Sequence, residues 1–452
     1  MMGLSEEFPL FPSGRERYAP FDSPRGSPLP DERQEEIPEF INQLLDDDQP
    51  THSSFTAPQT PNTNAEQKEL VFTKRETMTP YRDNRHASTS FVPKTQRFLH
   101  VKPGDQVQQQ FGTFQSYTDV GDMTKMENID DNEFLKMCCD QFGCRCLQKK
   151  LEDDDDDAID EIYERMLPIM NNLIADQFGN YLCQKLIEVV DDEQRLDILK
   201  CVSNNIGIIS KNIHGTRSVQ KMINCATTKA EIDELILSLS PHIVDLVFDG
   251  NGNHVIQECL KTFSKEQNKF IFDGILGDSF VEICEHKHGC CVVQRCIDFG
   301  NRGQLNKLVD KVISNTLEII TDPYGNYVVQ YILKVDVDHV CMDVTKIILD
   351  DLIVLSTQKF SSNVIEQLVM SDEVGVKELM FDKFLQYKDV ERLLQGSFSN
   401  YVIQTCLENS SREYHVKLSN WILPHIDSIK NISYYKKIQT KLLFEPKSSH
   451  FM

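Results

Sequence analysis

The sequence predicts an all-α solenoid, a row of similar helical units that stack side by side, preceded by a disordered N-terminal tail. Three observations predict it: a motif recurs eight times after about residue 125, its spacing is nearly constant, and the apolar residues follow a helical period with turn residues between units. Such a period is typical of α-solenoids, in which each unit buries its apolar face against its neighbours. The core can therefore form without any large globular domain.

The tail, residues 1–125, is rich in Pro, Ser, Thr, Gln and Asn and has no sustained apolar period. Such a composition cannot bury enough surface to offset chain entropy, so we expect disorder. One stretch is patterned, because the apolar residues from Ile37 to Leu45 have the spacing of an amphipathic helix. This pattern fits a transient helix as well as a helix that docks into a partner's groove.

The repeated motif opens with a short turn that ends in Gly or Ser. These residues lie at 143, 179, 215, 252, 289, 325, 361 and 399, in steps of 36, 36, 37, 37, 36, 36 and 38. Gly and Ser favour turns and helix starts, so each is expected to open a helix. Apolar pairs that follow, such as Val255 with Ile256 and Val328 with Val329, are expected to point into the stack. Residues 126–445 are therefore predicted to hold eight units with their flanks.

Each unit also places three polar or small side chains on one surface. Counted from the Gly or Ser, positions one and five lie one above the other on a helix, and position two projects beside them. The triplets are Cys144, Arg145, Gln148; Asn180, Tyr181, Gln184; Thr216, Arg217, Gln220; Asn253, His254, Gln257; Cys290, Cys291, Gln294; Asn326, Tyr327, Gln330; Ser362, Asn363, Glu366; and Asn400, Tyr401, Gln404.

These triplets differ from an ordinary solvated face, which would favour the strong helix formers Glu and Lys. Position five is Gln in seven units, with Glu366 as the exception, and position two is Tyr, Arg or His in six. A flat or planar cationic group can stack on a nucleic-acid base while neighbouring amides hydrogen-bond the base edge. The pattern therefore indicates a solenoid with an aromatic and amide face whose chemistry suits stacking on bases.

Net charge is −23, of which −6 lies on residues 1–120. This acidity argues against a protein that holds nucleic acid through phosphate neutralisation alone, so RNA binding must rely on the bases. Position six nevertheless carries a cation in four of the first five units, which predicts a local basic strip of Lys149, Lys185, Lys221 and Arg295. The run Asp153–Asp157 is expected on a solvated loop.

The motifs NYxxQ, SNxxE and CRxxQ resemble those of the Pumilio/FBF, or PUF, family of RNA-binding proteins, over residues 126–445. The resemblance implies a right-handed crescent of eight three-helix repeats with flanking caps, in which each repeat reads one base and position two stacks. It also implies that the last repeat meets the 5′ end of the RNA. Translational repression through a deadenylase complex and other RNA-regulatory proteins would follow, by a protein that is monomeric on RNA. The connection 371–395 is the candidate contact for such partners.

Edge chemistry assigns a base to each triplet. Asn with Gln can offer donors and acceptors to uracil, which suits the second, fourth, sixth and eighth units. Glu366 only accepts when ionised, and guanine alone among RNA bases presents two adjacent donors. A small residue with Gln suits adenine, as in the first, third and fifth units. From the eighth unit to the first, the code gives UGUAUAUA, the UGUA-initiated element that the resemblance places in mRNA 3′ untranslated regions.

One position departs from the family pattern. Cys291 stands where an arginine or aromatic residue usually stacks, so the fourth base is held less firmly or a base swings out nearby. Whether the centre of the site accommodates eight or nine nucleotides stays open.

Three other functions fit parts of the sequence. A protein-binding scaffold of the HEAT or armadillo kind would explain the acidity but not the recurring triplet. A nuclear PUF relative in ribosomal RNA processing would usually depart from the eight-unit code. A nuclease could use His214, His286 and His288, but no carboxylates with metal-ligand spacing repeat nearby, and a turn histidine is more often structural. The sequence therefore predicts neither an enzyme nor a cofactor.

The cysteines and the N-terminus bear on the compartment. All fourteen cysteines lie between Cys138 and Cys406, and the first residues have neither a basic segment nor a long apolar one. We expect reduced thiols and a cytoplasmic protein. The densest group, which runs from Cys138 to Cys146, lacks the paired spacing of a zinc site. No apolar run approaches the roughly 18 residues needed to span a bilayer, which predicts a soluble protein.

Overall fold

The computed structural model describes residues 129–153, 155–335 and 337–443. The chain divides into two units, Met1–Gln110 and Phe111–Met452, and every described residue belongs to the second. The predicted tail, residues 1–125, and its patterned segment lie outside the described residues. Within the described ranges the regular structure consists of helices without a strand, as expected for an α-solenoid.

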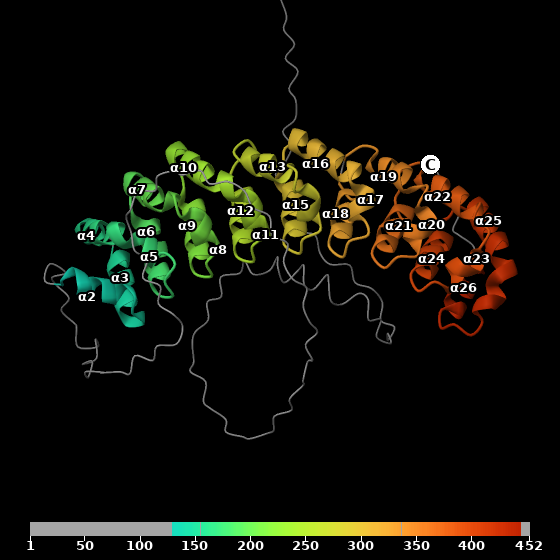
Figure 1. The fold of residues 1–452 in the computed structure, drawn as a ribbon, viewed down its shortest axis with the longest axis horizontal. Coiled ribbons are helices and arrows are strands. Elements are labelled where there is room, and N and C mark those ends of the chain that lie inside the picture. Colours follow the sequence, from blue (N-terminus) through green and yellow to red (C-terminus); the bar gives the residue numbers. More distant parts are fainter. Residues whose placement is uncertain (1–128, 154, 336, 444–452) are drawn as a thin grey trace, which may run out of the picture. The chain divides into compact units, whose positions relative to one another are not determined.

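Three rows of helices build the stack, and within this unit they follow an arc (Figure 1). The inner row carries the triplets and contains α3 (Gln141–Glu152), α6 (Gly179–Val189), α9 (Gly215–Cys225), α12 (Gly252–Thr262), α15 (Gly289–Phe299), α18 (Gly325–Ile332), α21 (Ser361–Val369) and α24 (Ser399–Asn409). The outer row lies along the upper edge in Figure 1 and contains α4 (Asp156–Met166), α7 (Asp192–Ser203), α10 (Lys229–Leu239), α13 (Lys269–Ile275), α16 (Arg302–Ser314), α19 (Val340–Ile348), α22 (Val376–Leu385) and α25 (Arg412–Ile422).

Shorter helices lead into the inner row and complete the stack. They are α2 (Asp131–Cys138), α5 (Met170–Leu173), α8 (Ile206–Lys211), α11 (Ile243–Phe248), α14 (Phe280–Cys284), α17 (Thr316–Ile319), α20 (Leu352–Ser356) and α23 (Val390–Gln395). Three 3₁₀ segments, η3 (Leu167–Ile169), η4 (Ser240–His242) and η5 (Leu423–Ile429), follow outer helices, and α26 (Tyr435–Leu442) packs against α24. Each unit of the solenoid therefore has a short, an inner and an outer helix.

A polar cap three residues before the Gly starts most inner helices. Asp176 Oδ1 accepts hydrogen bonds from the backbone N–H groups of Phe178 at 2.9 Å and Gly179 at 2.8 Å. Asn212, Asp249 and Asp322 make the same pair of contacts in their units. These caps satisfy N–H groups that a helix start leaves without partners.

The first unit differs from the expected pattern, because α3 begins at Gln141, two residues before Gly143. Asp140 adopts an extended conformation directly before the helix, and its carboxylate accepts from the N–H groups of Phe142 and Gly143, both at 2.9 Å. The residues between the cap and the Gly are therefore already helical in this unit.

Gly and Ser at the start of the inner helix meet the same neighbour, the carbonyl six residues earlier. A Cβ atom at Gly325 would lie 2.5 Å from the Ile319 carbonyl oxygen, which is too close for any side chain. In the last two units the hydroxyl groups of Ser361 and Ser399 instead donate to the equivalent carbonyls at 2.6 and 2.7 Å. Both residue types therefore let the short helix approach the inner helix closely.

In the outer row, side chains at helix starts join successive units. The third residue of α7, Gln194, closes a capping box with Asp191 and also donates to Asp160 of the preceding outer helix at 2.6 Å. Gln304 of α16 does the same with Asn301 and with the Lys265 carbonyl at 2.8 Å. The capping boxes thus fix the ends of helices and also the register between neighbours.

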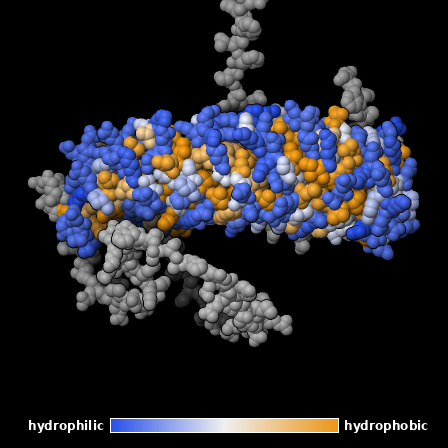
Figure 2. Space-filling model, turned by 45° about the horizontal axis from the view of Figure 1, so that its top comes forward, coloured by the Kyte–Doolittle hydropathy of each residue, from blue (hydrophilic) through white to orange (hydrophobic). Residues whose placement is uncertain are grey.

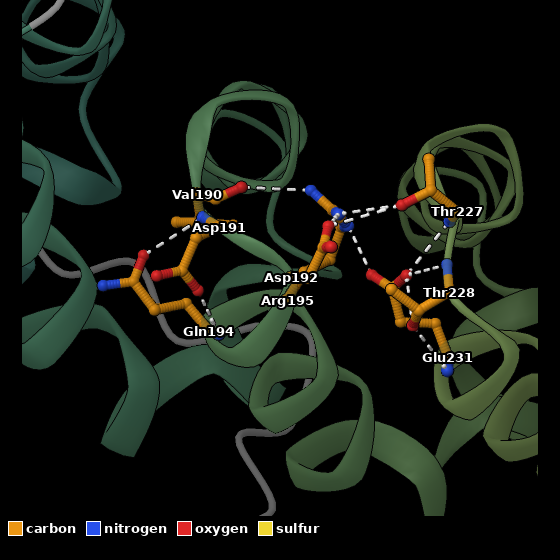
Figure 3. Close-up of polar contacts among 8 residues, drawn as sticks. All are labelled: Val190, Asp191, Asp192, Gln194, Arg195, Thr227, Thr228 and Glu231. Carbon is orange, nitrogen blue, oxygen red and sulfur yellow. Dashed lines mark hydrogen bonds and ion pairs between the residues drawn. The ribbon is translucent and has the colours of Figure 1, made fainter.

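One of these joints is an ion pair (Figure 3). Glu231 caps α10 through Thr227 and Thr228 and pairs with Nε of Arg195 from α7. The side chain of Glu231 is fully buried, and that of Arg195 is 8% exposed. Burial alone would raise the pKa of Glu231, but the hydrogen bonds from Thr228, Thr227 and Arg195 outweigh it, and the pKa falls below its usual value. The carboxylate is therefore held ionised inside the outer row.

The apolar pairs of the inner helices point into the stack, as expected. Val255, Ile256, Val328 and Val329 are fully buried. The stack is thin, and apolar residues reach its surface in patches among hydrophilic ones (Figure 2). Among the described helices, none combines the length and the hydropathy of a membrane span.

The acidic run Asp153–Asp157 is not a loop throughout. Asp156 and Asp157 form the first turn of α4, because carboxylates there interact favourably with the positive end of the helix dipole.

Candidate nucleic-acid interface

The three positions of each triplet differ in burial. Position one is buried in all eight units, at Cys144, Asn180, Thr216, Asn253, Cys290, Asn326, Ser362 and Asn400. Position five is half-buried in seven units, whereas Gln404 is only 3% exposed. The inner row thus presents position five over a floor made by position one.

In the four Asn units, the floor residue holds the amide above it. Gln330 Nε2 donates to Asn326 Oδ1 at 2.8 Å, while Asn326 Nδ2 donates to the carbonyls of Asp322 and Pro323 at 2.8 and 2.9 Å. The same contacts recur in the other three units, with Gln-to-Asn distances of 3.0, 2.8 and 3.0 Å. Asn therefore fixes one orientation of Gln, whose Oε1 and second N–H remain for a base edge.

The units with a small first residue hold Gln less uniformly. Gln220 donates to the Thr216 hydroxyl at 3.2 Å. The thiol of Cys144 instead donates to the Cys138 carbonyl at 2.7 Å, and that of Cys290 contacts the Lys287 carbonyl at 3.5 Å. Burial raises the pKa of Cys144 to about 12, so this thiol stays neutral. Position one is small in these units, which leaves room for a base edge with an unsubstituted carbon.

Position two projects where a base could stack. Arg145, Tyr181, Arg217 and Asn363 are exposed, and His254, Tyr327 and Tyr401 are half-buried. Cys291 is only 4% exposed, and its sulfur lies 4.0 Å from that of Cys290. The fifth unit therefore lacks a projecting stacker, as its sequence predicts.

Glu366 is oriented by a residue that the sequence analysis did not assign to the site. The hydroxyl of Thr405, on the next inner helix, donates to Glu366 Oε2 at 3.0 Å. Thr405 occupies position six, at which the sequence predicts only the cations of the basic strip. The sequence offers one signal for this role: the eighth unit has a hydroxyl residue at position six, and the preceding unit carries the only acidic residue at position five.

The predicted basic strip is largely compensated by carboxylates. Lys221 Nζ lies 2.5 Å from Glu188, and Lys185 lies 3.6 Å from Glu188 and 3.9 Å from Glu152. Arg295 lies 2.9 Å from Asp298. Burial would raise the pKa of Glu188, but the contacts with the two lysines lower it overall. A phosphate at these three cations must therefore compete with protein carboxylates. Lys149, the fourth member, is exposed.

The histidines considered for a nuclease have structural surroundings. His286 Nδ1 accepts from the N–H groups of His288 and Gly289 at 3.3 and 3.4 Å, so it replaces the Asp cap of other units. Burial lowers the pKa of His286 and lowers that of His288 to about 4. His214 precedes α9 directly. Among the residues that the structure describes, no cluster of three or more His, Cys, Asp or Glu could hold a metal, and all fourteen cysteines are free.

The connection 371–395, the candidate partner contact, is mostly helical. It contains α22 and α23, and the turn before α22 has Gly375 in the left-handed region at φ 87°. This connection therefore follows the plan of the other units.

The repeated units match a family model described as the Pumilio-family RNA binding repeat. The matched segments are residues 133–167, 171–203, 205–239, 242–276, 279–313, 315–339, 352–382 and 395–418. They cover more than half of the chain, and their number agrees with the eight units read from the sequence.

Curated relatives show the same likeness. A Pumilio domain-containing protein of Schizosaccharomyces pombe is 39% identical over 70% of this chain and 46% of its own length. Pumilio homolog 12 of Arabidopsis thaliana is 33% identical over 67% of this chain and 51% of its own length. The chain thus spans about half the length of these relatives.

Two solved structures resemble the described fold. The Puf4 RNA binding domain bound to an HO endonuclease RNA 3′ UTR recognition sequence is 40% identical, with a TM-score of 0.62, over 68% of this chain and 98% of that domain. The RNA-binding domain of yeast Puf5p bound to SMX2 RNA is 32% identical, with a TM-score of 0.64, over 69% of this chain and 95% of that domain. The chain belongs to the Pumilio, or PUF, family of RNA-binding repeat proteins.

Proposed function

We propose that this chain binds single-stranded RNA sequence-specifically through its inner row, one base per unit, and that it reads UGUA-initiated elements of the form UGUAUAUA in mRNA 3′ untranslated regions. The observation that carries the proposal is the Asn–Gln clamp, which recurs in alternate units with the same hydrogen bonds. A fixed amide presents one acceptor and one donor side by side, which can pair with N3–H and O4 of uracil. Relatives of this family that have been solved with RNA support the same use of the fold.

The seventh unit supports guanine at the second place. Glu366 is half-buried and ionisable, and its carboxylate can accept from N1–H and N2–H of guanine together. Adenine offers one donor on that edge, and its N1, which is an acceptor, would face the carboxylate instead of the second donor. A preference for guanine would therefore arise from a mismatch penalty as much as from attraction.

The regulatory outcome is also part of the proposal. Bound to a 3′ untranslated region in the cytoplasm as a monomer, the chain would repress translation and shorten mRNA lifetime by recruiting a deadenylase complex. A reporter mRNA that carries UGUAUAUA in its 3′ untranslated region should lose its poly(A) tail faster when the chain is expressed. The same reporter with UAUAUAUA should not respond.

The experiment that tests RNA reading is a titration of the full chain with UGUAUAUA and with UAUAUAUA at one salt concentration near physiological. We expect tight binding to the first RNA and a loss of about 1–3 kcal/mol on the second. Glu366→Gln is the matched control, because it keeps the size of the side chain and should remove the preference. Weak binding to both RNAs would contradict the proposal and favour a protein-binding scaffold.

A further inference from the structure

We propose that Thr405 is a positioning residue for base recognition, which fixes the Glu366 carboxylate and thereby sharpens discrimination at the second base. The inference rests on the proposed function of Glu366 and adds a residue from the neighbouring unit to it. Recognition of this base would then depend on two inner helices, α21 and α24, instead of one.

The contact joins two residues that come from different helices and leave little room for other arrangements. Thr405 Oγ1 donates to Glu366 Oε2 at 3.0 Å across 39 residues of sequence. Thr405 is 9% exposed, and as a β-branched residue in a helix it has few χ1 rotamers, so its hydroxyl is held in place. The preceding residue, Gln404, donates to Asn400 of its own unit at 3.0 Å. Consecutive residues of α24 therefore serve two different units.

In the seventh unit the residue at position one, Ser362, donates its hydroxyl hydrogen to the backbone, so a donor to Glu366 must come from another residue. In the Asn units the floor side chain accepts from position five, as Asn400 does from Gln404. In the seventh unit the only hydroxyl hydrogen of Ser362 is directed at the Lys359 carbonyl at 3.3 Å. Ser362 cannot donate that hydrogen to Glu366 at the same time, and the donor instead comes from Thr405.

The surroundings restrain the carboxylate of Glu366. Burial, followed by the charge of Glu366, raises the pKa of the Cys406 thiol, so the residue next to Thr405 is a neutral thiol beside this carboxylate. With Oε2 held by a hydroxyl, rotation of the carboxylate is restricted. Guanine needs both of its edge donors to meet carboxylate lone pairs in one plane, whereas a rotating carboxylate would also accept from the single donor of adenine.

The test uses the full chain with four variants: Thr405→Val, Thr405→Ser, Glu366→Gln, and Thr405→Val combined with Glu366→Gln. Each is titrated with UGUAUAUA, with UAUAUAUA, and with an RNA altered only at the first base. We expect Thr405→Val to lower the guanine-to-adenine affinity ratio about fivefold, in line with the typical net contribution of one hydrogen bond. Thr405→Ser should keep the ratio. In the Glu366→Gln background, Thr405→Val should have no further effect on it.

The first-base RNA and thermal unfolding separate positioning from a general structural role. The first base is assigned to Asn400 and Gln404, so its discrimination should stay within about twofold of the parent in Thr405→Val. An unchanged guanine-to-adenine ratio in Thr405→Val, with the ratio abolished in Glu366→Gln, would overturn the inference and leave the proposed function standing. Equal losses at both bases, or a loss that Thr405→Ser does not rescue, would also overturn it. A parent chain without guanine preference would remove the proposed function and the inference together.

Discussion

The outer and inner rows use polar side chains in opposite ways. In the outer row, polar groups at helix starts are satisfied within the protein and join one unit to the next, as Gln194 with Asp160 and Glu231 with Arg195 do. In the inner row, most polar contacts close within one unit, as Asn326 with Gln330 does, and the amide keeps an unused acceptor and donor. Saturated groups stabilise the stack, whereas half-satisfied groups are available to a ligand.

This contrast predicts that substitutions in the two rows separate stability from RNA recognition. A solenoid is stabilised by each unit and by its interface with the neighbours, so damage to an outer joint should reduce stability across that interface. Damage to an inner triplet should change the reading of one base and leave the interfaces intact.

The largest effect is expected at the buried ion pair of the outer row. Arg195→Met should lower the free energy of unfolding by about 3–5 kcal/mol, because it leaves the fully buried Glu231 without its charge partner. Urea denaturation followed by circular dichroism measures the loss. Lys200→Met on the same helix is the matched control, since Lys200 and Asp197 are both 55% exposed and such a pair contributes little.

The double variant Arg195→Met with Glu231→Gln tests the cause. Gln stands at the third position of α7 and α16, where its uncharged side chain closes a capping box, so the double variant should recover much of the loss. An Arg195→Met variant no less stable than Lys200→Met would show that the pair adds nothing to the joint.

A smaller effect on stability and a larger one on recognition are expected at the inner clamp. Asn326→Cys copies the fifth unit into the sixth and removes the group that orients Gln330. The preference at the third base of UGUAUAUA should move from uracil toward adenine, by about 1–3 kcal/mol, while unfolding changes less than in Arg195→Met. Titration of the variant with UGUAUAUA and with UGAAUAUA measures this shift in preference. The same base change at the first position is the control, and a variant that still prefers uracil at the third base would contradict the clamp.

Much of the fold and the frame of the site could be predicted because both are periodic. A step of 36 to 38 residues shows eight units, and position one, two and five follow from helix geometry once Gly or Ser marks the start. The cap at Asp176 or Asp322 has the same kind of signal, a polar residue at a fixed offset before the Gly, although general turn propensity alone does not predict it. Local rules therefore suffice for most of each unit.

Local rules of this kind do not predict which side chains pair between neighbouring units. Arg195 and Glu231 are one period apart, but their pairing depends on how α7 and α10 pack, which a single sequence does not state. Lys221 was counted as a cation for RNA, whereas Glu188 of the preceding unit neutralises it. Such long-range partners decide whether a charge stabilises the protein or remains for a ligand.

The smallest effect tests the joint between the short and inner rows. Ser399→Ala keeps Cβ but removes the hydroxyl that donates to the buried Leu393 carbonyl at 2.7 Å, so unfolding should become easier by about 1–2 kcal/mol. Ser399→Gly copies the first six units and allows a closer approach, and it should cost less than Ser399→Ala despite the greater chain entropy of glycine. Denaturation of the two variants side by side measures the order. The reverse order would mean that the serine units hold their short helix at a distance that glycine cannot support, and that Gly and Ser are not equivalent openings of the inner helix.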